Sequence, residues 1–300
     1  MSSTETRARK RFVIIRTLAR DCCIAALLAV APASAQQQRP GLAHVSAYAD
    51  LADLALAAPV VVSAKVHAFV RVPKKEAPGL PEGARRYLVR ADVDAALIAP
   101  GALPSRIQYL WDVPSNVRPD IDDKPVLLFL APVKGRADQF RLVSPRAQVA
   151  ATPALDTQVR AILKQARDPA LGHRVTGVTR AFTTPGSVPG EEQTQIFLKT
   201  ADAAPVSLIV TTRPGEAKRY GVAFSETIDP DAPPATKGTL GAYYLACGLP
   251  PHLPAEAIAD LDDEAKATVA ADYAFVLTQL AACGRTGTDA SSKPTEAQSG

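Results

Sequence analysis

Two stretches of the sequence alternate apolar and polar residues with a period of two. In 60–72, valine or alanine occupies every second position, with Ser63, Lys65 and His67 between them, and 85–98 repeats the pattern. Because successive side chains of a strand point to opposite faces, this period predicts two strands, each with one face in a core and the other in water. Such strands need a sheet that buries their apolar face, so the pattern favours a fold built mainly from β-structure.

Further elements are predicted around these two strands. Three more strands are expected, at 105–113, 126–131 and 140–144. The stretch VLLFLA at 126–131 has no polar face, as expected for a central strand that is covered on both sides. One helix is expected over 42–58, and Thr152-Pro153 provides an N-cap and a first residue for another. Closure of five strands removes exposed edges, so the order helix, five strands, helix predicts an OB-like five-stranded β-barrel domain over 42–167.

The first domain also resembles a known group of secreted domains. The stretches PVVVSAKV, RRYLVRADVDAAL and KPVLLFL, in that order, are similar to OB-fold domains of the netrin/TIMP-like kind, over residues 45–150. The inhibitors of that group use an N-terminal cysteine to reach a metalloprotease zinc. Residues 36–58 contain no cysteine, so the resemblance implies the fold and does not carry over the inhibitor function.

A second domain is predicted over 173–284, after the break at Asp168-Pro169. Turn dipeptides such as Pro185-Gly186 separate four strand candidates, at 174–182, 194–199, 206–211 and 220–225. Their succession favours a small antiparallel β-meander. Two helices, over 240–246 and from about Glu264 to Cys283, are expected to form a C-terminal helical pair, and the polar residues 285–300 a disordered tail. The predicted fold class is therefore mainly β with flanking helices, in a two-domain arrangement.

The first 35 residues predict an export signal. Six basic residues precede a short apolar run from Cys22 to Ala31, and the small-residue triplet Ala33-Ser34-Ala35 follows, with Gln36 as the first residue after the expected cleavage. An apolar run of this length is too short to span a bilayer. The segment Arg9–Val13 resembles a twin-arginine motif in which lysine replaces the second arginine, so ordinary Sec export is favoured. We therefore expect a periplasmic or secreted protein without stable membrane insertion after cleavage.

Removal of this leader changes the charge and the cysteine content. The whole chain carries a net charge of +4, but the residues after the leader hold 28 basic and 28 acidic side chains. A neutral chain gives no support to a nucleic-acid partner. Cys22 and Cys23 leave with the leader, and the remaining two, Cys247 and Cys283, are expected to form a disulfide bond in an oxidising compartment.

No local motif for catalysis or for a cofactor stands out. The four histidines are isolated in the sequence, at His44, His67, His173 and His252, whereas a zinc site needs three or four converging ligands. The acidic loop at 120–123 could offer oxygens to calcium, but a polar turn is favoured because it lacks the glycine and distal glutamate of an EF-hand. Tyr87, Tyr109 and Trp111 line the mouth of the barrel or, as we favour, pack in its core. The sequence thus predicts neither a catalytic residue nor a cofactor.

These observations favour a non-catalytic periplasmic binding or scaffolding module, whose partner is an envelope protein or a small ligand. One alternative is a periplasmic hydrolase whose site is assembled from distant residues, since catalytic groups are recognised by geometry. It would require a cleft that holds His67 or His173 beside a serine and a carboxylate. The other is an inhibitor of an envelope protease, for which the proline-containing loop at 73–83 is the candidate.

Overall fold

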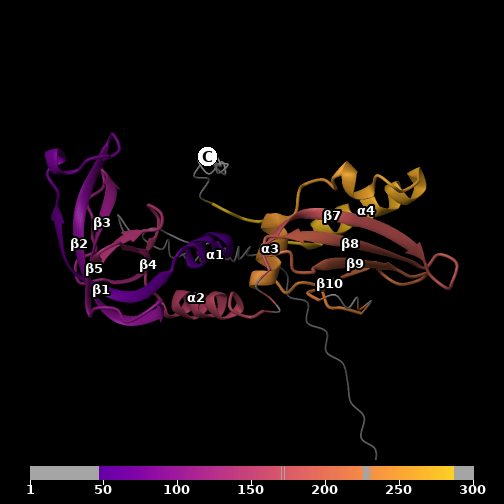
Figure 1. The fold of residues 1–300 in the computed structure, drawn as a ribbon, viewed down its shortest axis with the longest axis horizontal. Coiled ribbons are helices and arrows are strands. Elements are labelled where there is room, and N and C mark those ends of the chain that lie inside the picture. The colour runs from indigo at the N-terminus through magenta and orange to yellow at the C-terminus, as the bar shows by residue number, and fades with distance from the viewer. Residues whose placement is uncertain (1–46, 170, 172, 226–228, 230, 287–300) are drawn as a thin grey trace, which may run out of the picture. The chain divides into compact units, whose positions relative to one another are not determined.

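The two alternating stretches form neighbouring strands of a barrel, β1 (Val60–Arg71) and β2 (Ala84–Ile98), in the computed structural model shown in Figure 1. The structure describes residues 47–169, 171, 173–225, 229 and 231–286. The predicted cleavage residues Ala33, Ala35 and Gln36 therefore lie outside the described part, as does His44.

The barrel contains five strands in the order β1-β2-β3-β5-β4 and closes through pairing of β4 with β1. The other three strands are β3 (Arg106–Pro114), β4 (Pro125–Val133) and β5 (Arg136–Leu142). All neighbours are antiparallel except β3 and β5, which are parallel. The sequence pattern did not indicate the short strand β6 (Gln148–Ala150). It pairs with the first half of β4, on the edge opposite β1. The predicted five-stranded OB-like barrel is confirmed.

The barrel interior is filled by the inward residues of the alternating pattern. Tyr109 and Trp111 are almost completely buried in this core and Tyr87 lies at its edge, so core packing is the role the structure gives them. β4 is buried on both faces, as its apolar sequence predicted. Leu128 faces the barrel core, whereas Leu127 and Phe129 pack with the helices outside it.

Two helices flank the barrel. α1 (Tyr48–Ala57) begins later than the predicted helix, whose residues 42–46 are outside the described part. α2 (Pro153–Gln165) starts as expected, because the Thr152 hydroxyl accepts a hydrogen bond from the Leu155 amide at 3.2 Å. The two helices pack on each other and share one apolar cluster with the outer face of β4.

The second sheet is an antiparallel meander in the order β7-β8-β9-β10, as predicted. Its strands are β7 (Val175–Pro185), β8 (Glu192–Thr200), β9 (Ser207–Thr212) and β10 (Arg219–Ala223). α3 (Leu240–Gly248) and α4 (Asp263–Gln279) follow it, and both contact β7 (Figure 1). Two short 3-10 helices, Lys74–Glu76 and Ala255–Ile258, complete the described elements.

The last helix ends earlier than the sequence indicated. We expected it to continue to Cys283, but Leu280 has an extended backbone and α4 stops at Gln279. Alanines at 281 and 282 favour a helix locally, but the chain leaves the helix at Leu280, and Cys283 is bonded to Cys247 in α3. Close backbone packing fixes the end of α3 as well, because a Cβ atom at Gly248 would lie 2.2 Å from the Val175 carbonyl oxygen.

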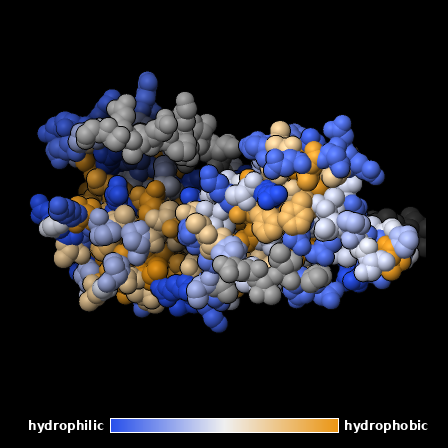
Figure 2. Space-filling model, turned by 45° about the vertical axis from the view of Figure 1, so that its right-hand side comes forward, coloured by the Kyte–Doolittle hydropathy of each residue, from blue (hydrophilic) through white to orange (hydrophobic). Residues whose placement is uncertain are grey.

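Apolar residues at the surface are dispersed. The large exposed ones in the described residues are Leu56, Val70, Leu110 and Val188, and Figure 2 shows hydrophobic residues in orange at several separate places among hydrophilic ones. No described helix combines the length and the apolar character needed to cross a bilayer.

Candidate ligand pocket beside the C-terminal strap

Residues 280–286, which we call the C-terminal strap, leave α4 and return to the two helices α3 and α1. A disulfide bond between Cys247 in α3 and Cys283 fixes the strap, with the two Cα atoms 4.8 Å apart. The pair is the one that the sequence indicated. Arg285 and Thr286, which we had placed in the polar tail, are bound by α1, whereas 287–300 lie outside the described residues.

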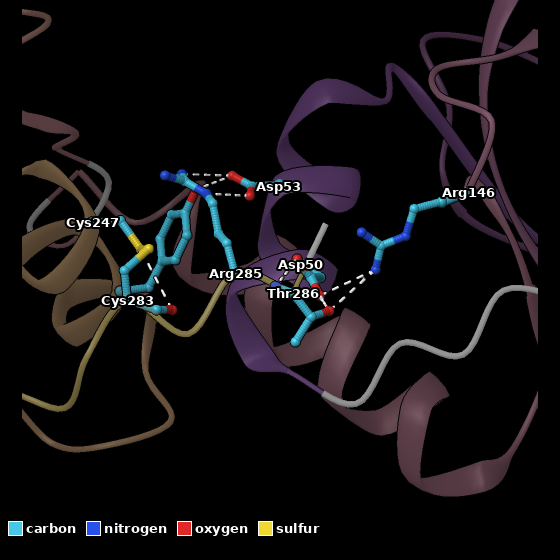
Figure 3. Close-up of polar contacts among 8 residues, drawn as sticks. Asp50, Asp53, Arg146, Cys247, Cys283, Arg285 and Thr286 are labelled. Atoms are coloured by element: carbon cyan, nitrogen blue, oxygen red, sulfur yellow. Dashed lines mark hydrogen bonds and ion pairs between the residues drawn. A yellow bond between two sulfur atoms is a disulfide. The ribbon is translucent and has the colours of Figure 1, made fainter. Parts of the chain in front are cut away.

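Arg285 attaches the strap to α1 through a carboxylate. Its guanidinium donates to the two oxygens of Asp53 at 2.6 and 2.9 Å (Figure 3). Its Cζ lies 5.8 Å from the centre of the Tyr243 ring. The Tyr243 hydroxyl donates to the same carboxylate at 2.5 Å. Burial, followed by the neighbouring Asp53, raises the pKa of Tyr243 well above its ordinary value, so this hydroxyl remains a donor. Three elements, α1, α3 and the strap, therefore meet at Asp53.

Asp50, one turn earlier in α1, makes a second attachment. It is 6% exposed and accepts hydrogen bonds from the backbone amide and the hydroxyl of Thr286. Arg146 donates to the same carboxylate at 3.2 Å (Figure 3). Burial alone would raise the pKa of Asp50, but the hydrogen bonds from Thr286 and Arg146 outweigh it and hold the pKa below its ordinary value. The carboxylate is therefore ionised in the folded protein at neutral pH.

A pocket of about 180 Å³ lies against the strap. Strap residues from Leu280 to Gly284 form one side, small residues of α3 such as Ala242 form another, and Tyr48, Tyr220 and Tyr243 contribute aromatic rings. Among the described lining residues, Lys237 carries the only formal charge. Because the walls are mainly apolar with few polar groups, the pocket is suited to bind an uncharged, apolar portion of a small ligand.

A second, polar pocket is also lined by Tyr243. Arg285 and Asp53 line it together with Arg174 and Tyr244. Burial raises the pKa of the Tyr244 hydroxyl, which keeps it protonated. The two pockets therefore differ in chemistry. The one lined by Asp53, Arg174 and Arg285 is charged, and the one beside the strap has mainly apolar walls.

The histidines do not assemble a hydrolytic site in the described residues. His173 Nδ1 lies 2.7 Å from a carboxylate oxygen of Asp202, and His67 Nδ1 lies 3.4 Å from Asp92. Neither histidine has a serine hydroxyl among its hydrogen-bond partners there, and His252 is exposed. In the described residues, no serine nucleophile therefore completes a catalytic triad with His173 and Asp202 or with His67 and Asp92.

The acidic loop forms a turn, and the described residues contain no group of three potential metal ligands. Asp123 has a left-handed backbone (φ 56°) and pairs with Lys65 at 2.7 Å. The proline-containing loop is exposed over most of its length, but Ala77 is buried and the Arg86 guanidinium donates to the Pro78 carbonyl at 2.8 Å. Both loops are therefore held by contacts within the chain, Asp123 with Lys65 and Pro78 with Arg86.

Sequence reasoning missed the charged contacts of the strap and one buried carboxylate. Asp272, on α4, is 1% exposed and accepts hydrogen bonds from Thr194 Oγ1 and Lys218 Nζ, each at 2.5 Å. A disulfide at Cys283 also anchors the residues next to it, and this was the one signal that could have assigned Arg285 and Thr286 to the folded part.

Comparison with known proteins adds no functional assignment. The sequence matches no protein-family model and no curated protein.

Proposed function

We propose that this chain is an exported, non-catalytic binding protein that holds a small, mainly apolar ligand in the pocket beside the strap. The observation that carries the proposal is the composition of the pocket wall, in which aromatic rings and alanines surround a single charged side chain. Few polar groups in a concave apolar site are typical of ligand binding. Proton-transfer chemistry would instead call for titratable groups at the reacting centre.

Two features support an exported location. The leader has the three regions of a signal peptide, and the Cys247–Cys283 disulfide suits an oxidising compartment. Intact mass of protein from an envelope fraction, measured after thiol alkylation with and without reductant, tests this part. We expect a first residue near Gln36 and no alkylation before reduction. A chain that retains residues 1–35 with free thiols would contradict export.

A neutral fluorescent probe such as N-phenyl-1-naphthylamine tests the pocket. We expect its emission to rise on addition of the protein, and we expect Ala242→Trp to abolish the rise because the indole fills the pocket. Ala161→Trp is the matched control, since Ala161 is exposed on α2 and does not line the pocket. Equal probe binding by both variants, with unchanged circular dichroism, would reject the pocket as the binding site.

A further inference from the structure

The positive charge of Lys237 in the pocket wall indicates that the ligand has a negatively charged head group. Building on the proposed function, we propose that the ligand is an apolar chain that ends in a carboxylate, and that Lys237 binds this carboxylate. The apolar chain would then lie between the tyrosine rings and the strap, with its head at the exposed side of the pocket where Lys237 stands.

Charge complementarity supports an anionic head. The lining contains an ammonium group and no carboxylate. Lys237 forms no ion pair with a described residue, in contrast to Lys218, whose ammonium group lies 2.5 Å from the carboxylate of Asp272. A carboxylate would gain a charge-assisted hydrogen bond from Lys237, whereas an ammonium head would be repelled.

Several other polar groups near the pocket are already bound within the protein, whereas the buried Tyr48 hydroxyl has no hydrogen-bond partner among the described residues. The Tyr243 hydroxyl donates to Asp53, the Thr239 hydroxyl donates to the Thr236 carbonyl at 2.6 Å, and the Tyr220 hydroxyl has a backbone hydrogen bond with Ala235. The first amide of α3, that of Leu240, donates to the Gln165 side chain at 2.8 Å. The Tyr48 hydroxyl is neutral and buried, so Lys237 is the one charged group in the described lining that is available for a carboxylate head.

Calorimetric titration with three eight-carbon compounds tests the inference: octanoate, octanol and octylamine, at neutral pH and low salt. For the unmodified chain we expect octanoate to bind about tenfold more tightly than octanol, as one charge-assisted hydrogen bond at a partly exposed site allows, and octylamine to bind least. Affinity across hexanoate, octanoate and decanoate should rise about fourfold per methylene until the pocket is full.

Variants at the lysine separate the head from the chain. Lys237→Gln should bring octanoate down to the affinity of octanol and leave octanol unchanged, and Lys237→Glu should reverse the order in favour of octylamine. Lys134→Gln is the matched control, because Lys134 is exposed at the turn between β4 and β5 and lines no described pocket. The control should retain the preference for octanoate.

The outcomes distinguish this inference from the proposed function. Equal binding of octanoate and octanol by the unmodified chain would overturn the carboxylate head and leave the apolar pocket intact. If none of the three compounds binds and the neutral probe also fails, both proposals are overturned. A dimer whose formation excludes octanoate would show that a second copy of the chain occupies the pocket, and would likewise overturn the inference.

Discussion

Arg285 and Asp53 form a two-fold hydrogen-bonded ion pair although 232 residues separate them in the sequence. The pair joins the strap to the helix that precedes the barrel, and the disulfide at Cys283 joins the same strap to α3. Because the strap forms one wall of the apolar pocket, these contacts also determine the shape of the proposed ligand site.

Removal of the ion pair should loosen the strap with a small effect on global stability. The side chains of Arg285 and Asp53 are 41% and 39% exposed, so solvent screens their attraction. We expect Arg285→Ala to lower the free energy of unfolding by about 0.5–1 kcal/mol and to increase hydrogen exchange of the strap amides. The control, Arg219→Ala, removes a more exposed pair with Asp231. Strap exchange that does not change in Arg285→Ala would contradict the anchoring role.

Loss of the disulfide should have a larger effect. The bond closes a loop with a sequence separation of 36, and on the chain-entropy model this stabilises the fold by roughly 4 kcal/mol. We expect the double variant Cys247→Ser, Cys283→Ser to unfold at a correspondingly lower urea concentration and to bind the neutral probe more weakly, because the wall of the pocket is released. Reductant should destabilise the unmodified chain and leave the double variant unchanged. Equal urea midpoints with and without reductant would reject this role.

Asp50 should make the stability of the fold depend on pH in the acidic range. Its pKa in the folded state is held below the ordinary value of 3.8, so the folded protein binds this proton less readily than the unfolded chain. The stabilisation is complete above the ordinary pKa and is lost as the pH falls through the folded value. The loss of stability between pH 5 and pH 3, from urea unfolding, should therefore be smaller in Asp50→Asn than in the unmodified chain. Asp120→Asn, which removes an exposed carboxylate, should retain the full loss.

Much of the fold could be predicted because its strands follow local patterns. The period of two in 60–72 and the apolar run at 126–131 reflect burial on one face and on both faces, and each corresponds to a barrel strand. Turn dipeptides separated the strands of the meander in the same way. β6 was missed because three residues are too few to show a period. The end of α4 was missed because the alanines at 281 and 282 favour a helix, although the backbone is already extended at Leu280.

The site was less predictable, because its contacts join residues far apart in the sequence. Asp53 and Arg285 are ordinary surface residues in their local context, and only the fold makes them partners. Asp272 lies on α4, and the local sequence does not mark it as buried, because a charged residue on a helix is normally solvated. Its burial depends on Thr194 in β8 and on Lys218 just before β10, and no local pattern indicates either contact.

The buried carboxylate of Asp272 leads to the strongest stability prediction. Lys218→Met removes its counter-ion and leaves a charge that is 1% exposed with only the Thr194 hydroxyl as a partner. Loss of one partner from a buried ion pair typically costs 3–5 kcal/mol; since the Lys218 side chain is 34% exposed, we expect about 2–4 kcal/mol, measured by urea unfolding. Addition of Asp272→Asn should recover part of this loss, because the uncompensated charge is removed. Lys266→Met is the matched control, since its partner Asp263 is fully exposed and 4.0 Å away. A Lys218→Met variant as stable as this control would show that water, and not Lys218, compensates the charge of Asp272.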